Sequence, residues 1–332
     1  MGFGVLFTQG VVSGDPHQVS REILEQASAA DRLGFDAALT TEHKYSEEYF
    51  GSPLHLAYAI AARTERVRVG TSIAIGPLYN PVELAQDAAM LDQLSGGRLF
   101  LGLGAGYLEE DFSTVGIPFG ERAQRLDEGV RVIREAWTKE RFSFAGRHYA
   151  FDEVSVIPKP RQGPGTPIHL GAWTPGGLRR AARLGDGWIS NALMSVDTMA
   201  QMASAYREEA RRHGRPGRVT AVRFCWPALS REEGERDFGA TALAMIRTLW
   251  EYGAIGDMPE VSSAADITLA DAVRDRIVFG TPDECAETVE RFRAKAGVDD
   301  FMLIFRHPTG PEQSKVLNAM ELFASDVAGR FR

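Results

Sequence analysis

Short apolar runs and amphipathic stretches alternate along most of the chain. Residues 3–8 form an apolar run, and the stretch 19–33 repeats apolar positions every three or four residues up to Gly34. An apolar run between turn residues predicts a buried strand. Apolar positions every three or four residues predict a helix, and a glycine often ends such a helix. By the same rules, further strands are expected at 36–40, 67–75, 98–103, 168–172, 187–191, 219–226 and 301–305. Further helices are expected at 53–64, 81–94, 122–138, 177–184, 196–213, 230–252, 282–296 and 314–328.

Eight strands that alternate with helices predict a parallel α/β fold, a (β/α)8 TIM barrel formed by a single domain over residues 1–332. The alternative is a doubly wound open sheet, but the first strand is not followed by the glycine pattern of a phosphate loop. Two segments interrupt the alternation and are interpreted as insertions, near 141–165 and 230–275. The first has the alternation and turn residues of a hairpin, and the irregular part of the second, 253–275, suits a mobile lid.

Composition narrows the class of protein. The net charge of −8 disfavours a nonspecific nucleic-acid or anionic-membrane binder. The two cysteines, Cys225 and Cys285, are too few for a disulfide framework or a cysteine-rich zinc site. Because no apolar run is long enough to span a bilayer and no N-terminal signal is visible, we expect a cytoplasmic enzyme or binding protein.

Candidate functional groups are expected at the C-terminal ends of the barrel strands. His43 follows the second predicted strand and could act as an acid, a base or a hydrogen-bond donor, although a packed structural histidine also fits this position. The glycines of 102–106 (GLGAG) would let a flat ligand approach the backbone, or form a tight turn. Residues 174–177 open a helix, where free amides favour an anion, and Arg179 follows within a turn. The histidines show no paired spacing, so no metal site is expected.

Five segments together resemble the bacterial luciferase-like family of flavin-dependent oxidoreductases. They are 29–43, 66–106, 120–137, 167–189 and 279–305, and they follow the family's order along most of the chain. The resemblance implies a barrel that binds a flavin-type cofactor. That cofactor is expected to be reduced FMN supplied by a separate reductase, with a deazaflavin as the alternative.

The resemblance also implies a site, position by position. His43 matches the family's active-site histidine near the ring, Ser72-Ile73 matches its non-proline cis peptide beneath the ring, and 174–177 matches its phosphate turn. The expected cofactor contacts are Ser72, Ile73, Gly104, Ala105, Gly106, Thr174, Gly176, Gly177 and Arg179. The expected substrate pocket consists of Glu42, Lys44, Trp173, Trp226 and Arg306, with His43 as the catalytic residue.

Two positions depart from the family's pattern. Ala105 stands where luciferases carry an arginine that meets the phosphate, so Arg179 or Arg180 would have to supply that contact. Lys44 stands where many relatives have a second histidine, which adds positive charge near the site. Both departures weaken the case for light emission and leave the cofactor open.

The leading hypothesis at this point is a monooxygenase that uses reduced FMN and dioxygen on a small, mostly apolar organic substrate. Trp173, Phe224 and Trp226 at strand ends suit such a substrate, and core packing is the alternative interpretation of these aromatic residues. A second hypothesis is a deazaflavin-dependent hydride-transfer oxidoreductase that needs no oxygen. A third is a non-catalytic flavin-binding homologue. The resemblance also implies a homodimer, with no nucleic acid or membrane as a partner.

Overall fold

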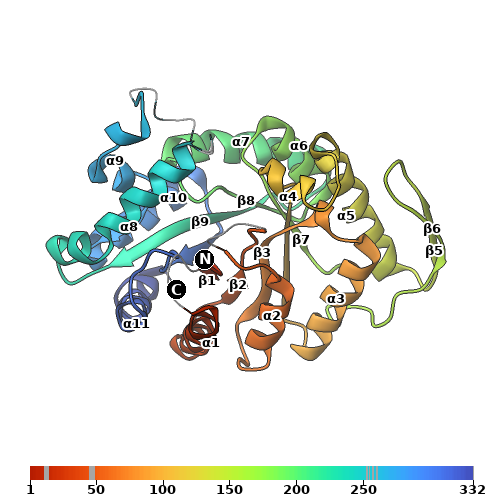
Figure 1. The fold of residues 1–332 in the computed structure, drawn as a ribbon, viewed down its shortest axis with the longest axis horizontal. Helices are drawn as coiled ribbons and strands as arrows, with labels where there is room; N and C mark the ends of the chain where they lie inside the picture. Colours follow the sequence, from red (N-terminus) through yellow and green to blue (C-terminus); the bar gives the residue numbers. More distant parts are fainter. Residues whose placement is uncertain are drawn as a thin grey trace.

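Eight parallel strands close into a barrel, which confirms the predicted fold (Figure 1). The computed structural model describes residues 1–10, 15–44, 49–251, 253, 255, 258 and 261–331. The ring runs β1 (Gly2–Phe7), β2 (Ala37–Thr40), β3 (Arg68–Ile75), β4 (Leu99–Gly104), β7 (Ile168–Gly171), β8 (Gly187–Ile189), β9 (Arg218–Pro227) and β11 (Asp300–Ile304). Pairing of β8 with β9 and of β11 with β1 closes it. All eight strands were expected from apolar runs.

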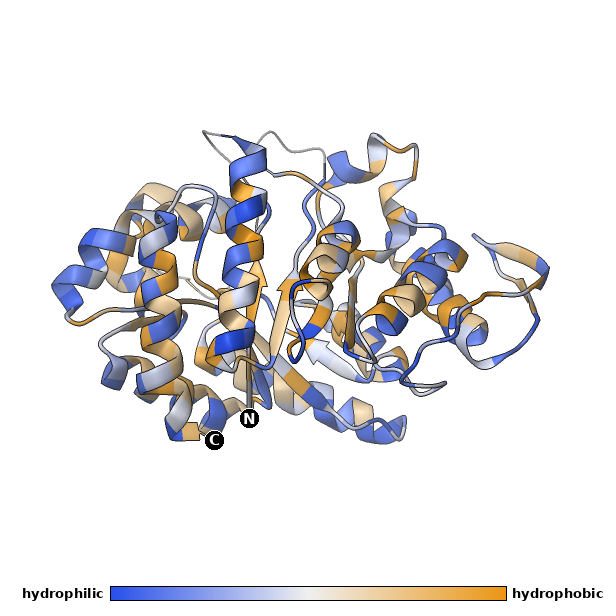
Figure 2. Cartoon of the chain, turned by 90° about the horizontal axis from the view of Figure 1, so that it is seen from below, coloured by the Kyte–Doolittle hydropathy of each residue, from blue (hydrophilic) through white to orange (hydrophobic). Residues whose placement is uncertain are grey.

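Helices surround the ring (Figure 1). They are α1 (Pro16–Leu33), α2 (Pro53–Ala61), α3 (Pro81–Leu94), α5 (Arg122–Thr138), α6 (Pro175–Leu184), α7 (Val196–Arg212), α8 (Arg231–Glu251), α10 (Pro282–Ala296) and α11 (Gln313–Leu322). Figure 2 shows hydrophilic and hydrophobic residues alternating along these helices, as expected for elements that bury one face. The bounds of α3, α5 and α10 match the predicted ranges to the residue.

Local chemistry explains where the helices begin and end. Thr281 accepts from the Glu284 backbone N–H while the Glu284 side chain accepts from the Thr281 N–H, which satisfies two amides at the start of α10. Gly34 ends α1 with a φ of 82°, a conformation that costs glycine little. Phe3 packs against Phe301 of the neighbouring strand at 5.8 Å and against Phe323 of the outer layer at 5.3 Å between ring centroids, which ties β1 to the outer layer.

The predicted insertions take different forms. Strands β5 (Phe142–Ala145) and β6 (Ala150–Val154) pair antiparallel within the segment expected to form a hairpin, and they lie at one edge of the molecule (Figure 1). The segment 253–275 contains the short α9 (Leu269–Val273), but residues 254, 256, 257, 259 and 260, on which the lid prediction partly falls, lie outside the described residues.

Two elements differ from the sequence prediction. Strand β10 (Val278–Gly280) pairs with the end of β9 outside the ring, and its three residues are too few to show a pattern. The final helix, expected at 314–328, is α11 followed by a π-helical segment (Phe323–Val327) and a 3-10 turn. Phe323 and Val327 in that segment are fully buried, so packing against the barrel accompanies the altered winding.

Candidate active site

The C-terminal ends of the strands define one mouth of the barrel, as in other parallel α/β barrels. Phe7 of β1 pairs with Thr40 of β2, and Thr40 pairs with Thr71 of β3. Gln9, His43 and Ser72 follow these paired positions by two, three and one residues. The strand register therefore places all three at the same end of the barrel.

The end of β3 forms a distinctive platform. The Ser72-Ile73 peptide is cis, as the resemblance predicts, and the register of β3 against β4 shifts between Thr71 and Ala74. A Cβ on Gly102 would lie 2.5 Å from the Thr71 carbonyl oxygen, and one on Gly104 would lie 2.7 Å from Ile73 Cδ1. Gly102 therefore leaves no room for a side chain because the β3 backbone approaches it too closely, whereas at Gly104 the Ile73 side chain would have to shift.

The turn before α6 has the geometry of an anion site. Thr174 caps the helix, and its Oγ1 accepts from the Gly177 N–H at 3.1 Å. A Cβ added to Gly176 would meet nothing within 4 Å, so the turn is open. Arg180 pairs with Asp127, whereas the exposed Arg179 forms no ion pair with a described residue. A helix N-terminus with a nearby cation favours a phosphate.

His43 belongs to a group of stacked and hydrogen-bonded rings. Its imidazole stacks on Tyr49 with ring centroids 4.3 Å apart, and the Tyr49 hydroxyl lies 3.1 Å from His307 Nε2. Burial lowers the pKa of His43 to about 4, and burial together with the charge of His43 lowers the pKa of His307 to about 4. Both imidazoles are therefore neutral at pH 7, the form in which a histidine can accept a proton.

Glu42 and Lys44 serve the scaffold around His43. The buried Glu42 carboxylate accepts from the Ile75 N–H and from the Tyr79 hydroxyl, both at 2.6 Å. Lys44 Nζ lies 3.3 Å from the same carboxylate and 4.6 Å from the centre of the Tyr79 ring. These contacts tie the segment after β2 to the end of β3. The extra positive charge of Lys44, expected from the sequence to act near the site, is therefore balanced by Glu42.

Three further predicted residues, Ala105, Gly106 and Trp173, follow the ends of β4 and β7. Gly106 has a φ of 79°, a left-handed conformation, and Ala105 beside it is half-buried. Trp173 is 36% exposed and meets Tyr107 edge-on, with ring centroids 5.3 Å apart. Both positions lie at the β4 and β7 ends of the mouth, where the sequence places them.

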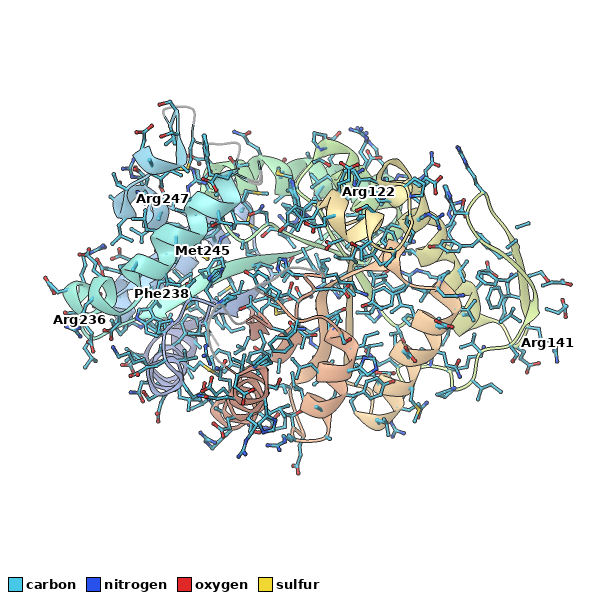
Figure 3. All side chains as sticks on the ribbon, viewed as in Figure 1. Arg122, Arg141, Arg236, Phe238, Met245 and Arg247 are labelled. Carbon is cyan, nitrogen blue, oxygen red and sulfur yellow. The ribbon has the colours of Figure 1, made fainter. Side chains whose placement is uncertain are left out.

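Trp226 and Arg306 are engaged in packing and ion pairing. Trp226 is 2% exposed and stacks at 5.2 Å on Phe238, which Figure 3 labels on α8. Arg306 pairs with Glu22 of α1. The structure thus joins these side chains to neighbouring helices rather than to the group around His43, and the core-packing interpretation holds for Trp226.

Four residues near this mouth are not among the predicted site residues. Tyr49 and His307 belong to the rings around His43, and Asp111 is a buried carboxyl whose pKa is raised to about 6, first by burial and then by Glu42 and Glu110. Gln9 is 2% exposed, and neither its amide nitrogen nor its amide oxygen has a hydrogen-bond partner among the described residues. Position after a strand was the one signal available for Gln9 and His307.

The fold and the site define a flavin-type oxidoreductase built on a parallel barrel. The sequence matches the family described as luciferase-like monooxygenase over residues 1–300, and the chain belongs to that family. It is 30% identical to an F420-dependent glucose-6-phosphate dehydrogenase of Segniliparus rotundus and 31% identical to the enzyme of the same name from Mycolicibacterium smegmatis. Each alignment covers 94% of both chains.

Solved structures show the same fold with different chemistry. The monooxygenase RslO1 from Streptomyces bottropensis is 28% identical, with a TM-score of 0.87 and full coverage of both chains. An F420-dependent secondary alcohol dehydrogenase has a TM-score of 0.80 at 21% identity, covering 100% of this chain and 99% of the other. At that identity the second likeness shows the fold alone.

The expected FMN-dependent monooxygenase is corrected by these findings. The curated relatives that align over nearly the whole chain are F420-dependent dehydrogenases, which favours the deazaflavin alternative. The reason for the error is physical. The barrel, the cis peptide and the phosphate turn hold features that flavins and deazaflavins share, so the residues that carried the resemblance could not separate the two cofactors.

Metal binding and membrane insertion were also considered for the described part of the chain. Among those residues, no group of three histidine, cysteine or acidic side chains could hold a metal ion. No helix of the described residues is both long and apolar enough to cross a membrane.

Proposed function

We propose that this protein is an F420-dependent oxidoreductase that transfers a hydride between the deazaflavin and a small alcohol or carbonyl compound. The observation that carries the proposal is the position of the half-buried, neutral imidazole of His43 after β2, next to the strand β3 that carries the cis Ser72-Ile73 peptide. The F420-dependent relatives support the choice of cofactor. Removal of hydride from an alcohol requires a base for its hydroxyl proton, and a neutral histidine is suited to that task.

The residues present fit such a cofactor. The platform of Ser72-Ile73 against the β4 glycines would hold the ring, and the buried Ser72 hydroxyl has no hydrogen-bond partner among the described residues. Thr174, Gly176 and Gly177 would hold the phosphate, and Arg179 would supply its counter-charge. F420, when bound, supplies the acceptor or donor of the hydride.

The chain's own part in the reaction is positioning and proton transfer. An imidazole nitrogen of His43 accepts the substrate's hydroxyl proton during oxidation and returns it during reduction. Stacking on Tyr49 orients the imidazole, and the hydrogen bond to His307 holds Tyr49 in turn. Desolvation lowers the pKa of both half-buried histidines, which keeps the base neutral at pH 7.

A homodimer remains part of the proposal. Met90 and Leu94 of α3 are 41% and 62% exposed and lie one turn apart on one face of the helix. Gln86, one turn earlier, donates to the carbonyl of Ile157, which is itself 73% exposed. Met90, Leu94 and Ile157 are the exposed apolar side chains of this region, which is termed here the α3 surface and supports contact with a second copy.

The test is a binding titration of the purified protein with F420 and with FMN, followed by turnover without oxygen. We expect F420 to bind at least about tenfold more tightly than FMN, and Arg179→Ala to weaken F420 binding by roughly fivefold through loss of one ion pair to phosphate. Arg183→Ala is the matched control because Arg183 already pairs with Asp127. Binding of FMN without binding of F420 would contradict the proposal.

A further inference from the structure

Gln9 presents an unusual feature at the mouth of the barrel. The residue is 2% exposed, yet neither polar atom of its carboxamide has a hydrogen-bond partner in the part of the chain that the structure describes. Buried polar atoms without partners destabilise a protein, and native structures contain few of them. Gln26 provides a contrast, because it is equally buried and donates to Gln313 Oε1 at 2.7 Å. Its place after a strand end at the mouth of the barrel distinguishes Gln9 from the unpartnered His169 within β7, and it puts the Gln9 amide where a ligand can be met.

The ring order shows which ligand Gln9 can reach. Gln9 follows β1, and β1 lies four strands from β7 in the ring of eight. The phosphate turn of Thr174 and Gly177 follows β7, so it stands across the mouth from Gln9. The neighbours of β1 are β2, which carries His43, and β11, which is followed by His307. Gln9 thus lies on the side of the proton-accepting histidine, where a substrate oxygen would be handled.

The cationic side chains on this side of the mouth limit the charge that a substrate can carry. Lys44 is paired with Glu42, Arg306 with Glu22, and the buried Arg223 donates to the carbonyls of Asn191 and Met194. Each of these three cations, described beside β2, β9 and β11, therefore already has a partner, and desolvating a phosphate dianion here without a free counter-charge would be strongly unfavourable.

We infer that Gln9 binds the oxygen of an uncharged alcohol or carbonyl substrate, and that the protein does not select phosphorylated sugars. The inference rests on the proposed function. In the oxidation, the substrate carbon loses a hydride to F420 and its hydroxyl loses a proton to His43, which leaves a C=O bond. The Gln9 amide N–H donates to the oxygen in both states, because alcohol and carbonyl oxygens each accept a hydrogen bond.

The substrate class is tested with pairs that differ in charge. F420-loaded protein is assayed with glucose 6-phosphate, glucose, 2-butanol and cyclohexanol, and the reduced cofactor is assayed with cyclohexanone. We expect turnover of uncharged compounds and no advantage from the phosphate. A kcat/KM for glucose 6-phosphate at least about tenfold above that for glucose overturns the inference and leaves the proposed function intact. Failure of every uncharged compound with F420 bound also overturns it, whereas failure to bind F420 removes the proposed function itself.

The role of Gln9 is tested by a measurement that needs no substrate. Gln9→Met keeps the shape and removes the orphaned amide, so we expect the unliganded protein to gain about 2 °C in Tm. Gln26→Met, the matched control, removes a satisfied amide and should lower Tm. Gln9→Met should leave F420 affinity within about twofold and lower kcat/KM for the uncharged alcohol by about tenfold. A lower Tm for Gln9→Met, or unchanged kcat/KM, overturns the assignment.

Discussion

His43 lies at the end of β2 against the ring of Tyr49, where burial keeps its imidazole neutral. His307 shares that environment through its hydrogen bond to Tyr49. His169 is a third buried histidine, stacked at 4.2 Å on Phe100 in β4, and burial lowers its pKa to about 4 as well. The same desolvation thus keeps two kinds of imidazole neutral, the proposed base at the mouth and a structural imidazole between strands.

Replacement of the base should separate chemistry from binding. We expect His43→Asn to lower kcat by about 100-fold or more, because a general base contributes on the order of 100- to 10,000-fold, with F420 affinity within about twofold. His213→Asn is the control, since His213 lies at the end of α7 beside Glu209. A kcat for His43→Asn close to that of the unaltered enzyme would show that another group takes the proton.

The pH dependence of turnover follows from the pKa of His43. The base form exists above a pKa of about 4, so kcat/KM should fall only as the pH drops towards 4, and it should not change around 6.5. Asp111, whose pKa is about 6, is the neighbouring group that titrates in between, and Asp111→Asn serves as the control. A fall in kcat/KM around pH 6.5 that persists in Asp111→Asn would contradict the neutral state of His43.

Stability should also depend on pH through these histidines. Their folded pKa lies below the ordinary value of 6.5, so the unfolded chain binds more protons between about 4 and 6.5. The stabilisation is present above 6.5 and is lost as the pH falls towards 4. We expect His169→Phe to reduce this loss, measured as Tm at pH 7.5 and pH 5. An equal fall in Tm for variant and parent would show that His169 does not contribute.

At the scale of elements, the contact between β3 and β4 shapes the platform. The β3 register shift and the cis peptide bring the backbone of Thr71 and the side chain of Ile73 against β4. Gly102 and Gly104 accept this approach because they have no Cβ. From its spacing alone, the GLGAG motif suited either a tight turn or a ligand cradle. In the structure, its glycines allow β3 and β4 to pack closely.

Substitution of Gly102 tests this contact. The new Cβ would meet the Thr71 carbonyl at 2.5 Å, and backbone cannot rotate away as a side-chain end can. We expect Gly102→Ala to lower the free energy of unfolding by about 1–3 kcal/mol and to weaken F420 binding, measured by urea denaturation and titration. Gly120→Ala is the control, because a Cβ there meets nothing within 4 Å. Stability equal to that of the control would refute the proposed packing.

At the scale of the whole molecule, the closed ring separates two tasks. The turn of Thr174 and Gly177 after β7 and the histidines after β2 and β11 belong to opposite parts of one mouth, so the proposed cofactor anchoring and proton transfer would use different strands. The α3 surface lies on the helical layer, away from the strand ends. A second copy could therefore bind there without covering the mouth.

The dimer proposal predicts an effect of charge on the α3 surface. Leu94→Glu would place a carboxylate on the α3 surface, at a position where the side chain is 62% exposed in the single chain. We expect the variant to sediment as a monomer in analytical ultracentrifugation while the unaltered protein sediments as a dimer. Leu229→Glu is the control, as Leu229 is 78% exposed outside this surface. A dimer that survives Leu94→Glu, or a monomeric parent protein, would contradict the α3 surface as the interface.

The sequence by itself determined the eight strands, most helix bounds, the cis peptide expected from the resemblance, and the turn at Thr174. These features depend on neighbours in the chain, through residue spacing, helix caps and glycine positions, or on a motif held in one segment. Only the tertiary structure decided which side chains meet at the mouth. Tyr49 and His307 are 258 positions apart, and Trp226 and Arg306 turn towards helices for reasons of packing and pairing that no local pattern contains. The orphaned amide of Gln9 is visible only once the surrounding strands are in place.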